Sequence, residues 1–279
     1  MLIGHTLGYR DYEKEMLKLR DYGYGAFDFQ GFVNTETELF IQHDRMFERS
    51  LMEMRRYADA NGLIFSQTHG PWRYPPTDAT ESDRAERLEK MKKAIYGTAI
   101  LGCPYMVVHP VMPFGVTEKQ DNERFMEINR TFFARLTEIA AEYQVTVCLE
   151  NMPFPQIPLT TPEQIADFVR ALGSERLRVC LDTGHALVMH RQPADAVRDI
   201  GKDLLATLHI HDNDGKDHHR MPGCGCADWE AFSDALREVG YAGCLSLETE
   251  APGSLPDALR EEWERLLAHI ARYIADRAK

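Results

Sequence analysis

The sequence predicts a single-domain (β/α)8 TIM barrel, and three observations support that fold class. Eight short apolar runs recur along the 279 residues, helical patterns separate them, and most of the runs end in a polar residue. Strands that alternate with helices over this length favour one closed parallel barrel spanning residues 1–279. A doubly wound open sheet is the alternative, but no G-x-G-x-x-G stretch or P-loop follows the first run, which weighs against it.

The predicted strands are short and rich in β-branched and aromatic residues. Several are almost continuously apolar, as expected for parallel strands that are covered on both faces. In chain order they are residues 1–8, 25–31, 63–70, 105–110, 145–151, 177–185, 205–212 and 244–250.

Helices are predicted where apolar residues recur at spacings of three and four. Residues 119–143 show this spacing, as do 229–239 and 263–274. The segment 161–173 opens with Thr-Pro and stops at a glycine, which is the pattern that begins and ends a helix. Two long polar segments are predicted as loops able to cover the mouth of the barrel. They are residues 71–84 and 111–122.

The chain is acidic, with a formal net charge of −12 and a pI of about 5.4. This argues against nucleic acid as a partner, because duplex binding depends on neutralising phosphates, although a local basic patch would overcome it. No signal sequence and no membrane span are expected. The six cysteines are scattered without a paired C-x-x-C, which predicts buried free thiols in a protein of the reducing cytoplasm.

Six potential metal ligands stand at the ends of predicted strands. In a barrel the C-terminal strand ends meet on one face, so these distant residues are expected in one pocket. A carboxylate after an apolar run is costly unless it is paired or binds a metal, which favours a functional role for Glu150 and Glu248. A lone histidine at such a place is more often structural, and Asp182 could instead cap the next helix. The six are His69, His109, Glu150, Asp182, His209 and Glu248.

The three carboxylates with His209 form a mixed oxygen and nitrogen donor set. Such a set suits Mn²⁺, Mg²⁺, Co²⁺ or Zn²⁺. His209 and His211 alternate along the strand end and should therefore point to opposite faces. We predict His209 as the inward ligand and His211 as a packing residue or an outer partner of the site.

These residues stand in motifs that resemble those of the xylose-isomerase-like TIM barrels. That superfamily holds sugar and sugar-phosphate isomerases and epimerases as well as the endonuclease-IV-type AP endonucleases. The resemblance covers the whole chain and is more specific for the superfamily than for a substrate. The motifs are THGPW at His69, VVHP at His109, CLENMP at Glu150, CLDTGHA at Asp182 and His185, LHIHDNDG at His209, DHHRMPGCGCADW at Asp217 and His219, and LSLETE at Glu248.

In the ketose epimerases of this group, a Glu, an Asp, a His and a Glu hold one divalent ion. The resemblance places these ligands at Glu150, Asp182, His209 and Glu248. It implies that the two glutamates remove and return a proton next to the substrate carbonyl, through an enediolate. A sugar or sugar derivative would then be the substrate, and exposed apolar helix faces are compatible with a homodimer. The substrate-binding residues would be His69, Trp72, His109, His185 and Arg220.

The resemblance to the AP endonucleases leaves a second function open, that of a trinuclear zinc phosphoesterase. It would add ligands at His69, His109, His185, Asp217 and His219. The chain departs from that pattern, because CLENMPFPQ replaces a small, Gly-rich run and no basic, aromatic DNA-reading loop is evident. A non-catalytic metal-binding barrel, or dehydration and lyase chemistry on sugar acids, are further alternatives.

Overall fold

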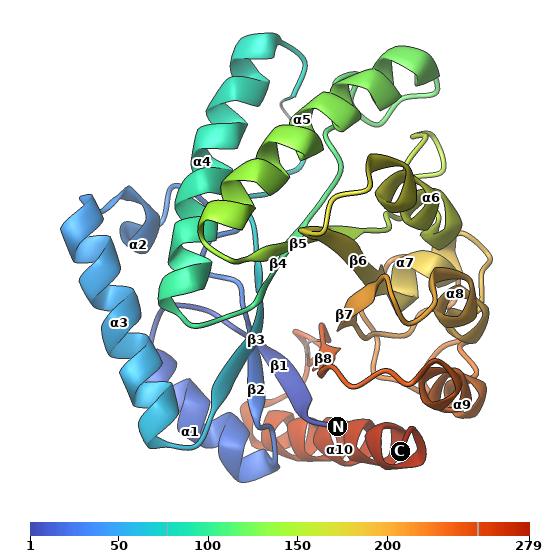
Figure 1. Ribbon diagram of the computed structural model, residues 1–279. Helices are drawn as coiled ribbons and strands as arrows, with labels where there is room; N and C mark the ends of the chain where they lie inside the picture. The colour runs from blue at the N-terminus through green and yellow to red at the C-terminus, as the bar shows by residue number, and fades with distance from the viewer. Residues whose placement is uncertain (77, 250) are drawn as a thin grey trace.

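The computed structural model describes residues 1–76, 78–249 and 251–279. Its strands form one sheet in the order β7-β6-β5-β4-β3-β2-β1-β8, and every neighbouring pair in that order is parallel. A parallel bridge between Ile210 and Leu247 brings the two edges of this sheet together beyond the end of β7. The fold is therefore a nearly closed (β/α)8 barrel with its helices outside (Figure 1), which confirms the predicted fold class.

Every strand lies inside a predicted apolar run. The runs are longer than the strands, because their last residues already belong to the loops at the mouth of the barrel. The main difference is the sixth run, 177–185, whose last three residues begin a helix; the last residue of the eighth run, Glu250, lies outside the described residues. The strands are β1 Ile3–Leu7, β2 Ala26–Phe29, β3 Ile64–His69, β4 Tyr105–Val108, β5 Thr146–Glu150, β6 Leu177–Asp182, β7 Leu205–His209 and β8 Leu245–Leu247.

The predicted helices are present, and two short helices lie in loops after β2 and β6. The predicted loop 71–84 is shorter than expected, because Thr80 and Asp83 form a capping box that starts a helix at Glu81. The helices are α1 Tyr12–Tyr22, α2 Glu38–Ile41, α3 Asp44–Ala60, α4 Glu81–Ile100, α5 Asn122–Glu142, α6 Pro162–Leu172, α7 Thr183–Val188, α8 Pro193–Ile200, α9 Trp229–Val239 and α10 Asp257–Arg277.

Two apolar regions hold this architecture together. The larger lies between the barrel and its helices, and a small one of Val107, Cys148 and Cys180 is separate from it. Cys103, Cys148 and Cys180 are buried free thiols as predicted, whereas Cys244 is only partly buried and Cys224 and Cys226 are exposed. None of the helices in the described residues is long and apolar enough to cross a membrane.

Candidate metal centre

The C-terminal ends of the strands deliver all six predicted side chains to the same end of the barrel. Parallel strands of a barrel have their carboxyl ends on one face, so residues far apart in the chain meet there. Strands β3, β5, β6 and β7 end on His69, Glu150, Asp182 and His209, while His109 and Glu248 directly follow β4 and β8.

Glu150, Asp182, His209 and Glu248 form the first ligand group. One potential ligand atom from each lies within 4.8 Å of those of the other three. His209 is central, because its Nδ1 is 3.0 Å from Glu150 Oε1 and 3.2 Å from Glu248 Oε2. Asp182 also accepts a hydrogen bond from the backbone of His185 at 2.6 Å, so it caps α7 as well as facing the group.

His69, His109 and Glu150 form the second ligand group, which shares Glu150 with the first. The Nε2 atoms of the two histidines are 3.1 Å apart, and His109 Nε2 is 3.0 Å from Glu150 Oε2. His69 Nδ1 lies 2.8 Å from the carbonyl oxygen of Gly70. If Nδ1 donates a hydrogen bond to this carbonyl, Nε2 of a neutral His69 carries a lone pair, and this nitrogen faces the second ligand group.

His185, His211, Asp217 and His219 form the third ligand group. Asp217 lies between two histidines, 3.4 Å from His185 Nε2 and 3.3 Å from His219 Nε2. The rings of His211 and His219 stack with centroids 4.0 Å apart. His211 Nε2 is also 3.0 Å from Asp182 Oδ1, so His211 touches the first group as an outer partner while it contributes to the third.

The charges of these groups shift several pKa values. Burial alone would raise the pKa of Glu150, but the positive charges of His209 and His109 outweigh it and hold that pKa well below its usual range. Burial raises the pKa of Glu248 despite the opposing positive charge of His209, and the nearby negative charge of Glu150 adds to the rise. Carboxylates this close repel one another unless a cation lies between them. The donor set of the first group therefore fits a divalent metal.

In the third group the pKa values of two histidines, His185 and His219, are raised. Burial would lower the pKa of His185, but the negative charges of Asp182 and Asp217 raise it to about 10. The pKa of His219 rises to about 9, because its hydrogen bond to Asp217 and the charge of Glu248 exceed the effect of burial. At neutral pH and without a metal, His185 and His219 therefore form ion pairs with Asp217.

A family model described as a xylose isomerase-like TIM barrel matches residues 16–273. The chain belongs to this family. The resemblance inferred from the strand-end motifs is thereby confirmed, and the family assignment covers nearly the whole barrel.

Relatives within this group include sugar epimerases and isomerases. The chain is 26% identical over 208 residues to a D-psicose 3-epimerase of Enterocloster bolteae, which covers 72% of this chain and 66% of that protein. It is 30% identical over 183 residues to an inosose isomerase of Halalkalibacterium halodurans, which covers 62% of each. A solved structure of the IOLI protein with a binding zinc atom shares the fold, with a TM-score of 0.79, 20% identity, and coverage of 100% of this chain and 98% of that chain.

Asp28 belongs to the site but was missed by sequence reasoning. It lies in β2, is fully buried, and its Oδ2 is 2.8 Å from His209 Nε2. The Gln67 amide donates to the same oxygen at 3.1 Å. The available signal was a carboxylate inside the apolar run 25–31, because burying an unpaired carboxylate there costs as much free energy as burying one at a strand end.

The loop after β7 is built around Asp212, which also went unpredicted. Its carboxylate accepts hydrogen bonds from the indole of Trp229 at 2.9 Å and from four backbone amides of the loop. This holds the segment that carries Asp217 and His219. Arg220, predicted to bind substrate, pairs with Asp214 at 2.9 Å on the half-exposed side of the same loop and is not a member of the three ligand groups.

Proposed function

We propose that the protein is a divalent-metal-dependent isomerase or epimerase of sugars or sugar derivatives. The first ligand group carries the proposal, because three buried or partly buried carboxylates and one imidazole converge within 4.8 Å. This donor set suits Mn²⁺, Mg²⁺, Co²⁺ or Zn²⁺. The epimerase and isomerase relatives support the same reaction class, and the zinc atom of the IOLI structure supports a divalent ion.

A divalent ion bound by this group would supply a Lewis acid and a template for a carbonyl oxygen and the hydroxyl next to it. Glu150 at the end of β5 and Glu248 after β8 both contact His209 Nδ1. In the proposed reaction one of these carboxylates removes a proton from the carbon beside the carbonyl, and the other returns a proton. The substrate passes through an enediolate between these two transfers.

The neighbouring histidines would position the substrate. His185 donates through Nδ1 to the carbonyl of Asn151 at 2.8 Å and directs Nε2 toward Asp217, beside the first ligand group. Trp72 packs edge-on against His109, with ring centroids 4.4 Å apart. We propose that His69, Trp72, His109 and His185 line the sugar site, and that Arg220 reaches it from the loop.

A trinuclear zinc phosphoesterase of the AP endonuclease type is the second candidate. The observation that favours it is that the three ligand groups are contiguous. Glu150 is common to two groups, and His211 of the third contacts Asp182 of the first. In this function His109→Ala and His219→Ala would each abolish cleavage, whereas in a sugar epimerase both substitutions would have milder effects on turnover.

Elemental analysis distinguishes the two candidates when the protein is purified without chelator or metal-affinity resin. About one divalent ion per chain supports the isomerase, and about three zinc ions per chain support the phosphoesterase. The reaction itself is tested by incubating the metal-loaded protein with a panel of ketoses in D2O. Deuterium uptake at the carbon next to the carbonyl supports the proposal, and its absence with every ketose, together with cleavage of abasic DNA, would overturn it.

We expect Glu248→Gln to abolish turnover while most of the metal is retained. The amide keeps an oxygen that can contact the ion but cannot exchange a proton with carbon. The readouts are deuterium uptake and metal content, and Glu262→Gln on the exposed side of α10 is the control. Substantial turnover in Glu248→Gln would contradict the role assigned to this glutamate.

A further inference from the structure

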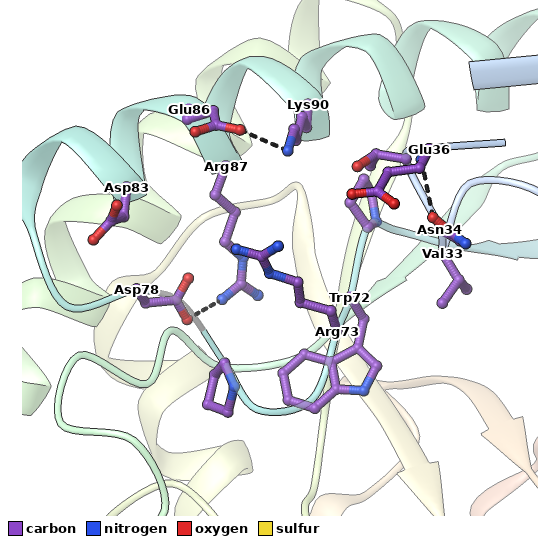
Figure 2. Close-up of a pocket in the computed structure, with 13 residues that line it drawn as sticks. Val33, Asn34, Glu36, Trp72, Arg73, Asp78, Asp83, Glu86, Arg87 and Lys90 are labelled. Atoms are coloured by element: carbon purple, nitrogen blue, oxygen red, sulfur yellow. Dashed lines mark hydrogen bonds and ion pairs between the residues drawn. The ribbon is translucent and has the colours of Figure 1, made fainter. Parts of the chain in front are cut away.

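A cavity of about 450 Å³ lies beside the ligand groups rather than among them. Its walls come from the segment after β2, the segment after β3, and the first turns of α4 (Figure 2). This volume lies within the range of small-molecule sites. The residues that matter for its chemistry are Asn34, Glu36, Trp72, Arg73, Arg87 and Lys90.

The cavity shares a wall with the second ligand group. Trp72 lines the cavity, and its ring lies 4.4 Å from the ring of His109. Arg87 lines it as well and donates to the backbone carbonyl of His109 at 2.8 Å. The cavity and the second ligand group are therefore neighbours, connected through Trp72 and Arg87.

The charges around the cavity are largely paired with one another. Arg87 contacts Asp78 at 2.6 Å, and Lys90 contacts Glu86 at 2.7 Å (Figure 2). The lining contains the four acidic residues Glu36, Asp78, Asp83 and Glu86 against the three basic residues Arg73, Arg87 and Lys90. A phosphate or carboxylate site needs an excess of positive charge, which this lining does not provide.

The lining instead combines an aromatic face with many hydrogen-bonding side chains. Trp72 contributes an aromatic ring to the lining, and Asn34, Glu36 and Arg73 contribute hydrogen-bond donors and acceptors. A sugar ring has the matching chemistry, since its C–H face is apolar and its hydroxyls both donate and accept. We propose that the cavity is a subsite for a neutral sugar unit attached to the ketose, so that the substrate is glycosylated rather than phosphorylated. This rests on the proposed function.

The test compares ketoses that differ only in what is attached to them. Isothermal titration of the Mn²⁺-loaded full chain would measure affinities for fructose, fructose 6-phosphate and the glucosyl or galactosyl fructoses isomaltulose, turanose and lactulose. We expect at least one disaccharide to bind about tenfold more tightly than fructose, as stacking of one ring on an indole allows. Equal affinities throughout, or a gain confined to fructose 6-phosphate, would overturn the subsite.

Two variants connect this gain to the cavity. Trp72→Ala removes the aromatic face, and Thr35→Phe narrows the cavity without removing Trp72. In each, the ratio of disaccharide to fructose affinity should fall toward one. Tyr74→Ala is the matched control, because Tyr74 is an exposed aromatic residue of the same loop that does not line the cavity. A ratio that survives both cavity variants, with folding verified by thermal melting, contradicts the proposal.

A metal-free measurement separates the subsite from the proposed reaction. The cavity contains no member of the three ligand groups, so methyl α- and β-glucoside should give saturation-transfer NMR signals with metal-free protein and lose them in Thr35→Phe. If ketoses exchange deuterium but neither glucoside binds, the subsite alone is wrong. If a glucoside binds but no ketose exchanges, the reaction is wrong and the sugar-binding cavity stands.

Discussion

A single buried carboxylate fixes which nitrogen of His209 faces the first ligand group. Nε2 of His209 lies 2.8 Å from Oδ2 of Asp28, while Nδ1 of His209 lies between Glu150 and Glu248. A metal-binding histidine commonly donates its other N–H to a carboxylate, which sets the tautomer and raises the basicity of the binding nitrogen. The Gln67 amide bonds to Asp28 and to the carbonyl of Leu208, so the orienting carboxylate is itself held in place.

We expect Asp28→Asn to weaken divalent metal binding by about 10- to 100-fold. The amide has nearly the same shape, but it lacks the negative charge that favours a protonated Nε2. Titration of Mn²⁺ into metal-free protein would measure the effect, with Asp59→Asn on the exposed surface of α3 as the control. Unchanged affinity would mean that His209 is oriented by its packing alone.

At the scale of elements, the loop after β7 behaves as a small folded unit. The Asp212 carboxylate accepts hydrogen bonds from backbone amides at both ends of the loop, and an antiparallel bridge joins Asp212 to Arg220. The loop packs on α7 so closely that a Cβ at Gly184 would overlap the ring of His211. This internal bonding positions the segment that brings Asp217 and His219 to the third ligand group.

Asp212→Asn should loosen this loop while the barrel stays folded. The side-chain amide nitrogen of the asparagine would face backbone N–H groups where a carboxylate oxygen now accepts from them. This should lower the free energy of unfolding by about 1–3 kcal/mol. Hydrogen exchange should show faster exchange confined to the loop, and thermal melting would report the loss of stability. Asp214→Asn, which weakens only exposed contacts with Arg220 and His218, is the control. Exchange spread evenly over the barrel would contradict a local role.

At the scale of the whole molecule, the barrel could be predicted because its signals are local. Each strand run and each strand-end ligand is visible in a few consecutive residues, and the barrel geometry then brings Glu150, Asp182 and His209 together. Asp28 escaped prediction because its importance depends on a contact from β2 to β7 across the barrel. The ion pair between Arg220 and Asp214 could not be predicted either, because it depends on the fold of the loop.

The first strand and the last helix are also joined by a contact that depends on pH. His5 of β1 lies 3.4 Å from Glu264 of α10, and both are largely buried. Burial would lower the pKa of His5, but the negative charge of Glu264 raises that pKa above its usual value, with smaller contributions from the backbone carbonyl of Thr6 and from Glu15. A raised folded-state pKa stabilises the fold below the ordinary histidine pKa of about 6.5, and this stabilisation is lost as pH rises through the folded-state value.

Glu264→Gln should therefore lower the free energy of unfolding by about 1 kcal/mol at pH 5.5 and by much less at pH 9. Urea unfolding at the two pH values would measure this, with Glu261→Gln on the exposed face of α10 as the control. An equal loss at both pH values would show that Glu264 acts through packing rather than through the charge on His5.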